Sequence, residues 1–190
     1  DYCLLRDDFL KRRKINLNVN GNIDRVFIFF GGIDYENYTK VALDAVKKLN
    51  VNHLIFDVVV GNQNPNKNYI KALCNDFGYN YYCQISNIAE IMSKADLAIG
   101  AGGSTSWERC CLGLPSVVVP IAENQIAIAH SIDSFGAAIC IDNPKNLCES
   151  VYKAIHSLQS DPSRILSMSE SCMKLVDGLG TKRVLIELGA

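Results

Sequence analysis

The stretch that decides the fold is Ala98-Ile99-Gly100-Ala101-Gly102-Gly103-Ser104-Thr105-Ser106-Trp107-Glu108. An apolar run ends in three glycines within four residues, and serine and threonine then open a helical segment. Free backbone N–H groups at such a helix start, together with its dipole, suit a phosphate or diphosphate. A plain strand-to-helix turn, in which Ser104 only caps the helix, explains the same pattern. The residues of this stretch leave both interpretations open.

Outward from this stretch, strand-like apolar runs alternate with segments of helical spacing. We expect strands at 26–30, 54–60, 81–85, 96–100, 116–119 and 137–141, and helices at 38–49, 69–77, 88–93, 104–112, 125–135, 145–158, 161–177 and 181–189. This alternation predicts an α/β fold with a doubly wound, Rossmann-like parallel sheet. Ligands bind such sheets beyond the carboxyl ends of the strands, so the loops after the first, third, fourth and fifth strands are the candidate site.

The chain divides into a short leading segment and one domain. Residues 1–24 are interpreted as a linker because they contain the turn signal Asn18-Val19-Asn20-Gly21-Asn22. Residues 25–190 are expected to form a single Rossmann-like domain with C-terminal helices. The opening Asp1-Tyr2-Cys3-Leu4-Leu5 has no initiator methionine, and we interpret the chain as an excised domain or a processed fragment.

Composition excludes several classes of partner. The hydrophobic fraction is 48%, the charged fraction is 21% and the net charge is −1, which suits a globular domain and gives no electrostatic footprint for nucleic acid. The longest basic run, Lys11-Arg12-Arg13-Lys14, is interpreted as a solvated linker or helix face. Apolar runs are too short for stable membrane insertion. The eight cysteines form no C-x-x-C pair, so we expect reduced thiols, a cytoplasmic protein, no metal and no cofactor.

Two further features flank the glycine-rich stretch. Glu108 lies one helical turn beyond it, where a carboxylate can accept both hydroxyls of a ribose, although a first-turn glutamate also simply suits the helix dipole. Gly31 and Gly32 end the first strand and either face the same ligand or form a plain turn. The sequence Ile33-Asp34-Tyr35-Glu36 follows them. It breaks the G-x-G-x-x-G fingerprint and disfavours a dinucleotide.

Polar residues at the other strand ends complete the candidate set. Glu123-Asn124-Gln125 follows the fifth strand, where it can bracket a sugar, although Asn124 also fits an ordinary helix cap. Backbone amides around Ile85, at the end of the third strand, can read a base edge. His53 and His156 are expected to be structural or solvated, whereas His130 lies near the rim. No nucleophile–histidine–acid set and no metal-ligand set can be assembled, so the chain is expected to bind rather than to react.

These residues together resemble a known family. Gly100–Glu108, the following Arg109-Cys110-Cys111-Leu112-Gly113-Leu114-Pro115, Pro120 and Glu123-Asn124-Gln125 closely resemble the C-terminal domain of the PseG family. These are UDP-2,4-diacetamido-2,4,6-trideoxy-β-L-altropyranose hydrolases of pseudaminic acid synthesis, related to spore-coat polysaccharide proteins of the SpsG type. More distantly, the chain is similar to the donor-binding C-terminal half of MurG-like glycosyltransferases of the two-domain GT-B architecture. The resemblance covers most of residues 2–142.

The resemblance implies roles for particular residues. Gly102, Gly103, Ser104 and Thr105 would hold the diphosphate of UDP or of a UDP-linked amino sugar, with Gly31 and Gly32 opposite. Glu108 would bind the ribose, the backbone around Ile85 the uracil, and Asn124 and Gln125 the sugar.

The family's catalytic residue is expected outside this chain. In these hydrolases a histidine of a G-x-G-H motif in the N-terminal domain assists attack by water on the anomeric carbon. No such string occurs here, so no catalytic residue is assigned, an N-terminal domain is expected to be missing, and the chain alone is expected to be inactive. The donor-binding domain of a glycosyltransferase and a non-catalytic nucleotide-binding module remain as alternatives.

Overall fold

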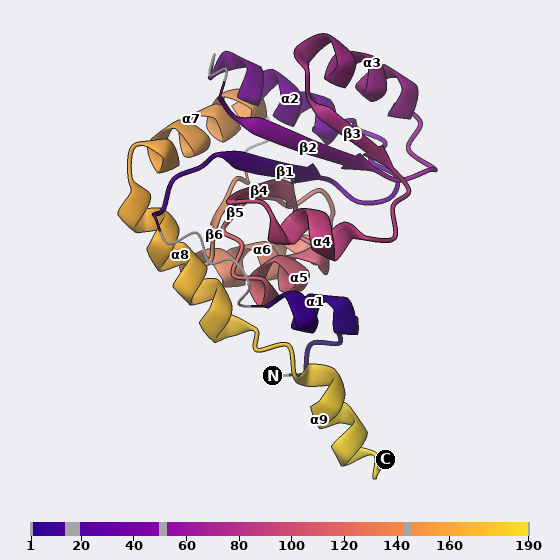
Figure 1. Cartoon of the computed structure of the whole chain (residues 1–190), viewed down its shortest axis with the longest axis vertical. Helices are drawn as coiled ribbons and strands as arrows, with labels where there is room; N and C mark the ends of the chain where they lie inside the picture. The colour runs from indigo at the N-terminus through magenta and orange to yellow at the C-terminus, as the bar shows by residue number, and fades with distance from the viewer. Residues whose placement is uncertain (1, 14–19, 50–52, 143–145, 190) are drawn as a thin grey trace.

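A single parallel sheet organises the domain (Figure 1). The computed structural model describes residues 2–13, 20–49, 53–142 and 146–189. Its six strands are β1 (Arg25–Phe29), β2 (Ile55–Val60), β3 (Asn80–Cys83), β4 (Leu97–Ala101), β5 (Ser116–Val119) and β6 (Ala138–Cys140). They pair in the order β3-β2-β1-β4-β5-β6, and every pairing is parallel. The chain winds outward in both directions from the β1–β4 pair, which is therefore the topological switch point. The predicted doubly wound parallel sheet is confirmed.

Helices cover both faces of the sheet (Figure 1). Those of the described residues are α1 (Asp7–Arg12), α2 (Tyr38–Lys48), α3 (Lys67–Phe77), α4 (Ile88–Ser93), α5 (Thr105–Cys111), α6 (Glu123–Ser134), α7 (Leu147–Gln159), α8 (Pro162–Leu175) and α9 (Gly180–Glu187). One core layer packs α2, α3 and α7 on the sheet, and the other packs α1, α4, α5 and α6 on its opposite face, while α8 contributes to both. Within the described ranges, no helix has the length and the apolar character needed to cross a membrane.

Local signals explain where several helices begin and end. Asp161 accepts a hydrogen bond from the Arg164 backbone N–H, and Pro162 occupies the first turn of α8, where proline is tolerated. Gly78 ends α3 in the left-handed conformation at φ +71°. The cap interpretation of Asn124 is wrong, because α6 begins at Glu123 and places Asn124 inside its first turn.

The cysteines lie in both core layers. All eight thiols are free. Cys74 is buried in the layer that contains α2, α3 and α7, whereas Cys110, Cys111 and Cys172 are buried in the opposite layer. They pack there among apolar side chains.

The N-terminal segment packs on the domain. Residues 7–12, within the segment expected to be a linker, form α1, and its Phe9 is fully buried. Arg13 donates to the carbonyl oxygens of Cys111, Met173 and Val176 at 3.0, 2.8 and 2.6 Å. The basic run was expected to be solvated, and Arg13 departs from that expectation because it links this segment to α5 and α8. Lys14, and residues 18 and 19 of the expected turn, lie outside the described residues.

The loops after β1 and β2 are in close backbone contact. A Cβ atom at Gly61 would lie 2.0 Å from the carbonyl oxygen of Gly32, whereas a Cβ atom at Gly32 would have no neighbour within 4 Å. The missing side chain at position 61 therefore sets the position of the Gly31–Gly32 turn.

Gly61→Ala is expected to lower the free energy of unfolding by roughly 1–3 kcal/mol, because the added methyl group displaces backbone rather than a flexible side chain. Gly32→Ala is the matched control and is expected to change it by less than about 1 kcal/mol. Urea unfolding followed by circular dichroism measures both. Equal effects of the two substitutions would contradict the close contact.

Candidate functional site

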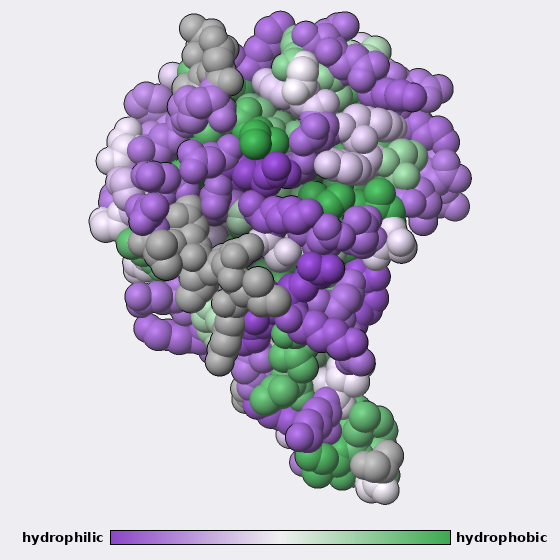
Figure 2. Space-filling view, viewed as in Figure 1, coloured by the Kyte–Doolittle hydropathy of each residue, from purple (hydrophilic) through white to green (hydrophobic). Residues whose placement is uncertain are grey.

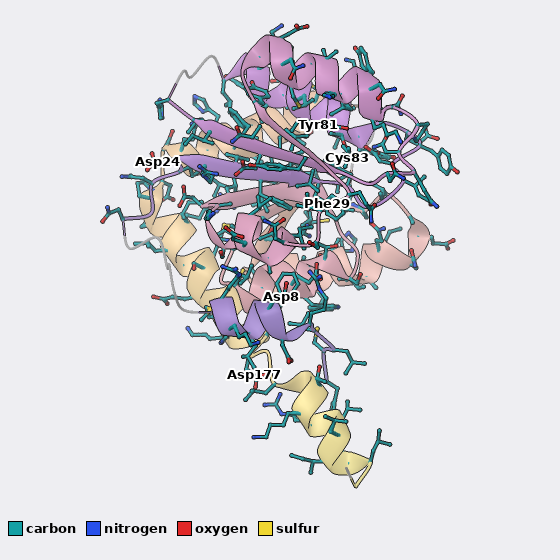
Figure 3. All side chains as sticks on the ribbon, turned by 45° about the vertical axis from the view of Figure 1, so that its right-hand side comes forward. Asp8, Asp24, Phe29, Tyr81, Cys83 and Asp177 are labelled. Atoms are coloured by element: carbon teal, nitrogen blue, oxygen red, sulfur yellow. The ribbon has the colours of Figure 1, made fainter. Side chains whose placement is uncertain are left out.

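The candidate site lies at the carboxyl edge of the sheet, around the switch point. Because all strands are parallel, their C-terminal loops share one edge. Phe29 and Cys83, the last residues of β1 and β3, lie toward the same end of the sheet in Figure 3, and Asp24 lies at the other end. Phe29 pairs with Gly100. The loop that begins with Gly31 and Gly32 is therefore the direct neighbour of the loop through Gly102 and Gly103.

The loop after β4 leaves backbone donors free. The N–H of Gly102 donates to the Val119 carbonyl at 3.1 Å. In contrast, the N–H groups of Gly103, Ser104 and Thr105 donate to no acceptor in the described part of the chain. Ser104 is exposed and its hydroxyl forms no capping hydrogen bond to α5, so the interpretation of Ser104 as a simple cap is wrong. The arrangement offers three neighbouring donors to an anion.

Gln125 lies against this loop. A Cβ atom at Gly103 would be 3.4 Å from Gln125 Nε2, and one at Gly102 would be 2.9 Å from the Ala129 methyl group. The side-chain oxygen of Gln125 accepts from the Ile121 backbone N–H at 3.2 Å, which fixes the direction of the amide. Gly102 must therefore be small for α6 to approach. The structure thus brings three of the predicted residues together.

The loop after β1 is fixed by an aspartate. Asp34 is buried, has φ +51°, and accepts from the backbone N–H groups of Tyr38 and Thr39 at 2.8 and 2.9 Å and from the Thr39 hydroxyl at 2.6 Å. Asp34, which lies in the segment that breaks the dinucleotide fingerprint, therefore accepts hydrogen bonds from the backbone N–H groups in the first turn of α2. Gly31 and Gly32 remain accessible in front of it.

Glu108, Ile85 and Asn124 occupy different surroundings. Glu108 is half-buried, and burial raises the pKa of its carboxyl; Asp8 adds to this rise, while Arg6 and Arg109 oppose it. Ile85 is half-buried against the core layer that contains α4 and α5. Asn124 is exposed on the first turn of α6. Their roles in binding remain predictions.

Sequence reasoning did not single out Arg109, which the structure places beneath the glycine loop. Its side chain is fully buried, and its Nη2 donates to the Ala101 carbonyl and to Ser106 Oγ, each at 2.8 Å. Burial lowers the pKa of Arg109 to about 10, so the guanidinium stays charged at neutral pH. The only signal in the sequence is an arginine followed by two cysteines and a leucine, an apolar run.

A cavity of about 480 Å³ opens beside β5 and β6 and includes Glu123, His130 and Asp142 in its lining. His130 Nε2 lies 2.6 Å from Asp142 Oδ2, and the Cys140 thiol donates to Asp142 Oδ1 at 3.0 Å. These three side chains could share a metal ion, which sequence spacing did not suggest because they come from α6, β6 and the segment that follows. They are already hydrogen-bonded to one another, and His130 and Asp142 are exposed, so we assign no metal to them.

A second cavity, of about 370 Å³, lies away from the glycine loop. Tyr2, Cys3, Trp107, Asp177 and Gly180 line it, between the N-terminal segment, α5 and the connection from α8 to α9. None of the residues predicted to bind a ligand lies in its wall.

Comparison with known proteins agrees with this architecture. The chain is 27% identical over 190 residues to the spore coat polysaccharide biosynthesis protein SpsG of Bacillus subtilis, covering 97% of this chain and 55% of that protein. It is 29% identical over 157 residues to a UDP-N-acetylglucosamine--N-acetylmuramyl-(pentapeptide) pyrophosphoryl-undecaprenol N-acetylglucosamine transferase of Latilactobacillus sakei, covering 78% of this chain and 43% of that protein. The chain thus spans about half the length of these relatives.

Solved structures share the fold. MurG of Acinetobacter baumannii superimposes with a TM-score of 0.67 at 22% identity, over 96% of this chain and 52% of that one. HepE of Anabaena, solved in complex with UDP and glucose, gives a TM-score of 0.64 at 15% identity, over 100% of this chain and 54% of that one. The predicted likeness to the C-terminal half of the GT-B architecture is confirmed. A family model, the glycosyltransferase family 28 C-terminal domain, matches residues 25–179, and the chain belongs to this family.

Proposed function

We propose that this chain is the UDP-sugar-binding domain of a two-domain enzyme of surface-polysaccharide synthesis. The observation that carries the proposal is the row of free N–H groups at Gly103, Ser104 and Thr105, placed at the switch point and backed by Gln125. Backbone donors of this kind bind the oxygens of a diphosphate without needing a cationic side chain at the surface. Two solved structures with this fold, HepE of Anabaena and MnaA of Staphylococcus aureus, are complexes with UDP.

The remaining parts of the ligand follow from the position of the diphosphate. Gly31 and Gly32 face it from the loop after β1, and the N–H groups of Gly103, Ser104 and Thr105 hold its oxygens. The N–H of Gly102 is bonded to Val119, so Gly102 contributes by allowing α6 to approach the loop. Glu108 accepts the ribose hydroxyls, and the backbone at Ile85 contacts the uracil. The sugar extends toward α6, where Asn124 and Gln125 provide amide groups on the side of the loop away from β1.

We propose hydrolysis of the sugar–UDP bond as the reaction of the whole enzyme. The loop then stabilises the negative charge that develops on the departing diphosphate. Support comes from the PseG-like string Trp107–Pro115 and from the relationship to SpsG along 97% of the chain. Transfer of the sugar to an acceptor is the second candidate, favoured by the match to the Latilactobacillus sakei transferase. The two reactions use the same donor site and differ in the group that attacks the anomeric carbon.

An N-terminal domain is the proposed partner. The alignments cover 55% of the length of SpsG and 43% of the length of the Latilactobacillus sakei transferase. Exposed apolar side chains of Tyr2, Leu4, Leu185, Ile186 and Leu188 lie at the N-terminal segment and on or next to α9. Figure 2 shows this apolar surface at the protruding end of the molecule. We propose that this surface packs against the partner domain, which would also supply the catalytic residue.

Gly103→Asp is expected to weaken UDP binding at least about 100-fold, because it sets a carboxylate against the diphosphate on the same loop. The matched control, Asn75→Asp, adds the same charge to the exposed face of α3 and is expected to leave the Kd unchanged. Isothermal titration calorimetry measures both. If Gly103→Asp binds UDP as tightly as the wild type, and circular dichroism shows an intact fold, then the loop is not part of the UDP site.

As the pH is lowered, UDP affinity is expected to begin to fall at a higher pH than it would if Glu108 were an exposed glutamate with an ordinary pKa. The reason is that burial raises the pKa of Glu108, so the carboxylate that accepts the ribose hydroxyls is protonated early as the pH falls. The Kd ratio between wild type and Glu108→Gln, measured from pH 7.5 down to pH 4.5, isolates this effect, because titration of the phosphate is common to both proteins. Parallel pH profiles for the two proteins would contradict the ribose assignment.

The isolated 190-residue chain is expected to bind UDP without turning over UDP-sugars. Release of UDP by the same domain joined to its partner, in buffer without an acceptor, identifies a hydrolase; release only with an added acceptor identifies a transferase. An enzyme-coupled assay for UDP distinguishes these outcomes. Turnover by the isolated chain would overturn the assignment of catalysis to the partner domain.

A further inference from the structure

Arg109 is a buried cation without a buried anion. Of the charged side chains in the described ranges, Asp34, Asp57 and Arg109 are buried. Asp57 pairs with Arg25 at 2.8 Å, and Asp34 accepts three hydrogen bonds from the start of α2. Arg109 forms no ion pair with a described residue, and its only acceptors there are the neutral Ala101 carbonyl and Ser106 hydroxyl. Its buried Nε and Nη1 atoms donate to no acceptor in the same part of the chain.

The guanidinium lies at the switch point. Arg109 Nη1 is 3.0 Å from where a Cβ atom at Gly100 would be, so glycine at this position makes room for it. Gly100 pairs with Phe29 on one side and with Val118 on the other. The charge is therefore held against the last residues of β4, next to the end of β1. Its bonded acceptor, Ala101, immediately precedes the Gly102–Gly103 turn.

Such a group is unfavourable unless an anion compensates it. Moving a guanidinium out of water costs several kcal/mol, and two hydrogen bonds to neutral groups recover only part of that. Charges interact strongly across the low-dielectric interior, so an anion bound on the adjacent loop would offset the cost. The N–H groups of Gly103, Ser104 and Thr105, which have no acceptor among the described residues, belong to that same loop.

We propose that Arg109 is a positioning residue for the diphosphate. It fixes the glycine loop through Ala101 and Ser106, and its charge, which no ion pair with a described residue neutralises, attracts the diphosphate from beneath the loop. The inference rests on the proposed function, because it assumes that the ligand at this loop is a nucleoside diphosphate. Beyond the proposed function, we infer that the buried Arg109 side chain makes the domain bind UDP more tightly than the neutral nucleoside uridine.

The test compares UDP with uridine on the 190-residue chain. Arg109→Met removes the charge and keeps the length of the side chain. It is expected to weaken UDP binding about tenfold and to leave uridine binding unchanged, while Arg109→Lys keeps the charge and is expected to lose less than about threefold. Calorimetry or competition measurements give the two dissociation constants for each protein.

Arg13→Met is the matched control. Arg13 also donates to backbone carbonyls, of Cys111, Met173 and Val176, but it lies away from the glycine loop. It is expected to lower the midpoint of urea unfolding without altering the ratio of the UDP and uridine dissociation constants. In contrast, Arg109→Met is expected to shift that ratio without lowering the midpoint, because a buried unpaired charge has been removed.

A measurement on the wild type keeps the inference testable if Arg109→Met does not fold. The ¹⁵N resonance of Arg109 Nε is expected to shift on addition of UDP and to stay in place on addition of uridine. Equal shifts with the two ligands, or an unchanged UDP-to-uridine ratio in folded Arg109→Met, would overturn the role of Arg109. If the wild type does not bind UDP, the proposed function itself is wrong.

Discussion

The parallel pairing of β1 with β4 is the constraint on which the rest of the molecule depends. It places two chain segments that are about 70 residues apart next to each other, with Phe29 opposite Gly100, and sends the following connections to opposite faces of the sheet. In the loop after β4, the N–H groups of Gly103, Ser104 and Thr105 have no acceptor among the described residues. Helix α6 approaches closely enough for Gln125 to contact the same turn.

The candidate site is built from backbone more than from side chains. Glycine is required where other groups approach: Gly61 against Gly32, Gly102 against Ala129, and Gly100 against Phe29 and Arg109. Each of these contacts depends on the small size of a glycine. In the proposed function, the loops fixed in this way hold the nucleotide, and the partner domain supplies the catalytic residue.

Sequence patterns predicted the architecture well because the strands are short segments rich in apolar residues that alternate with segments of helical spacing. The six strands and the eight expected helices are present, with shifts of a few residues at their ends. Short-range hydrogen bonding was harder to predict. Ser104 and Asn124 belong to residue types that favour caps, yet neither caps its helix, since α6 starts at Glu123 and α5 leaves the Ser104 hydroxyl free.

Contacts between distant elements were beyond the reach of the sequence. The sequence predicts a linker where the structure has α1, because the few apolar residues of this helix are buried only by packing against α4 and α5. The proximity of His130, Cys140 and Asp142 depends on how α6 packs beside β6. The Nε and Nη1 atoms of Arg109 have no acceptor among the described residues. Residue spacing in the sequence cannot predict this, because it depends on which groups the fold places around the side chain.

The distribution of thiols between the two core layers gives the domain an internal reporter. Cys74 lies on one side of the sheet, and Cys110, Cys111 and Cys172 lie on the other. A small alkylating reagent reaches each of them only when its own layer opens. The order in which mass spectrometry detects the modified peptides therefore reveals which side of the sheet loosens first, and whether an added nucleotide slows only the layer beneath the glycine loop.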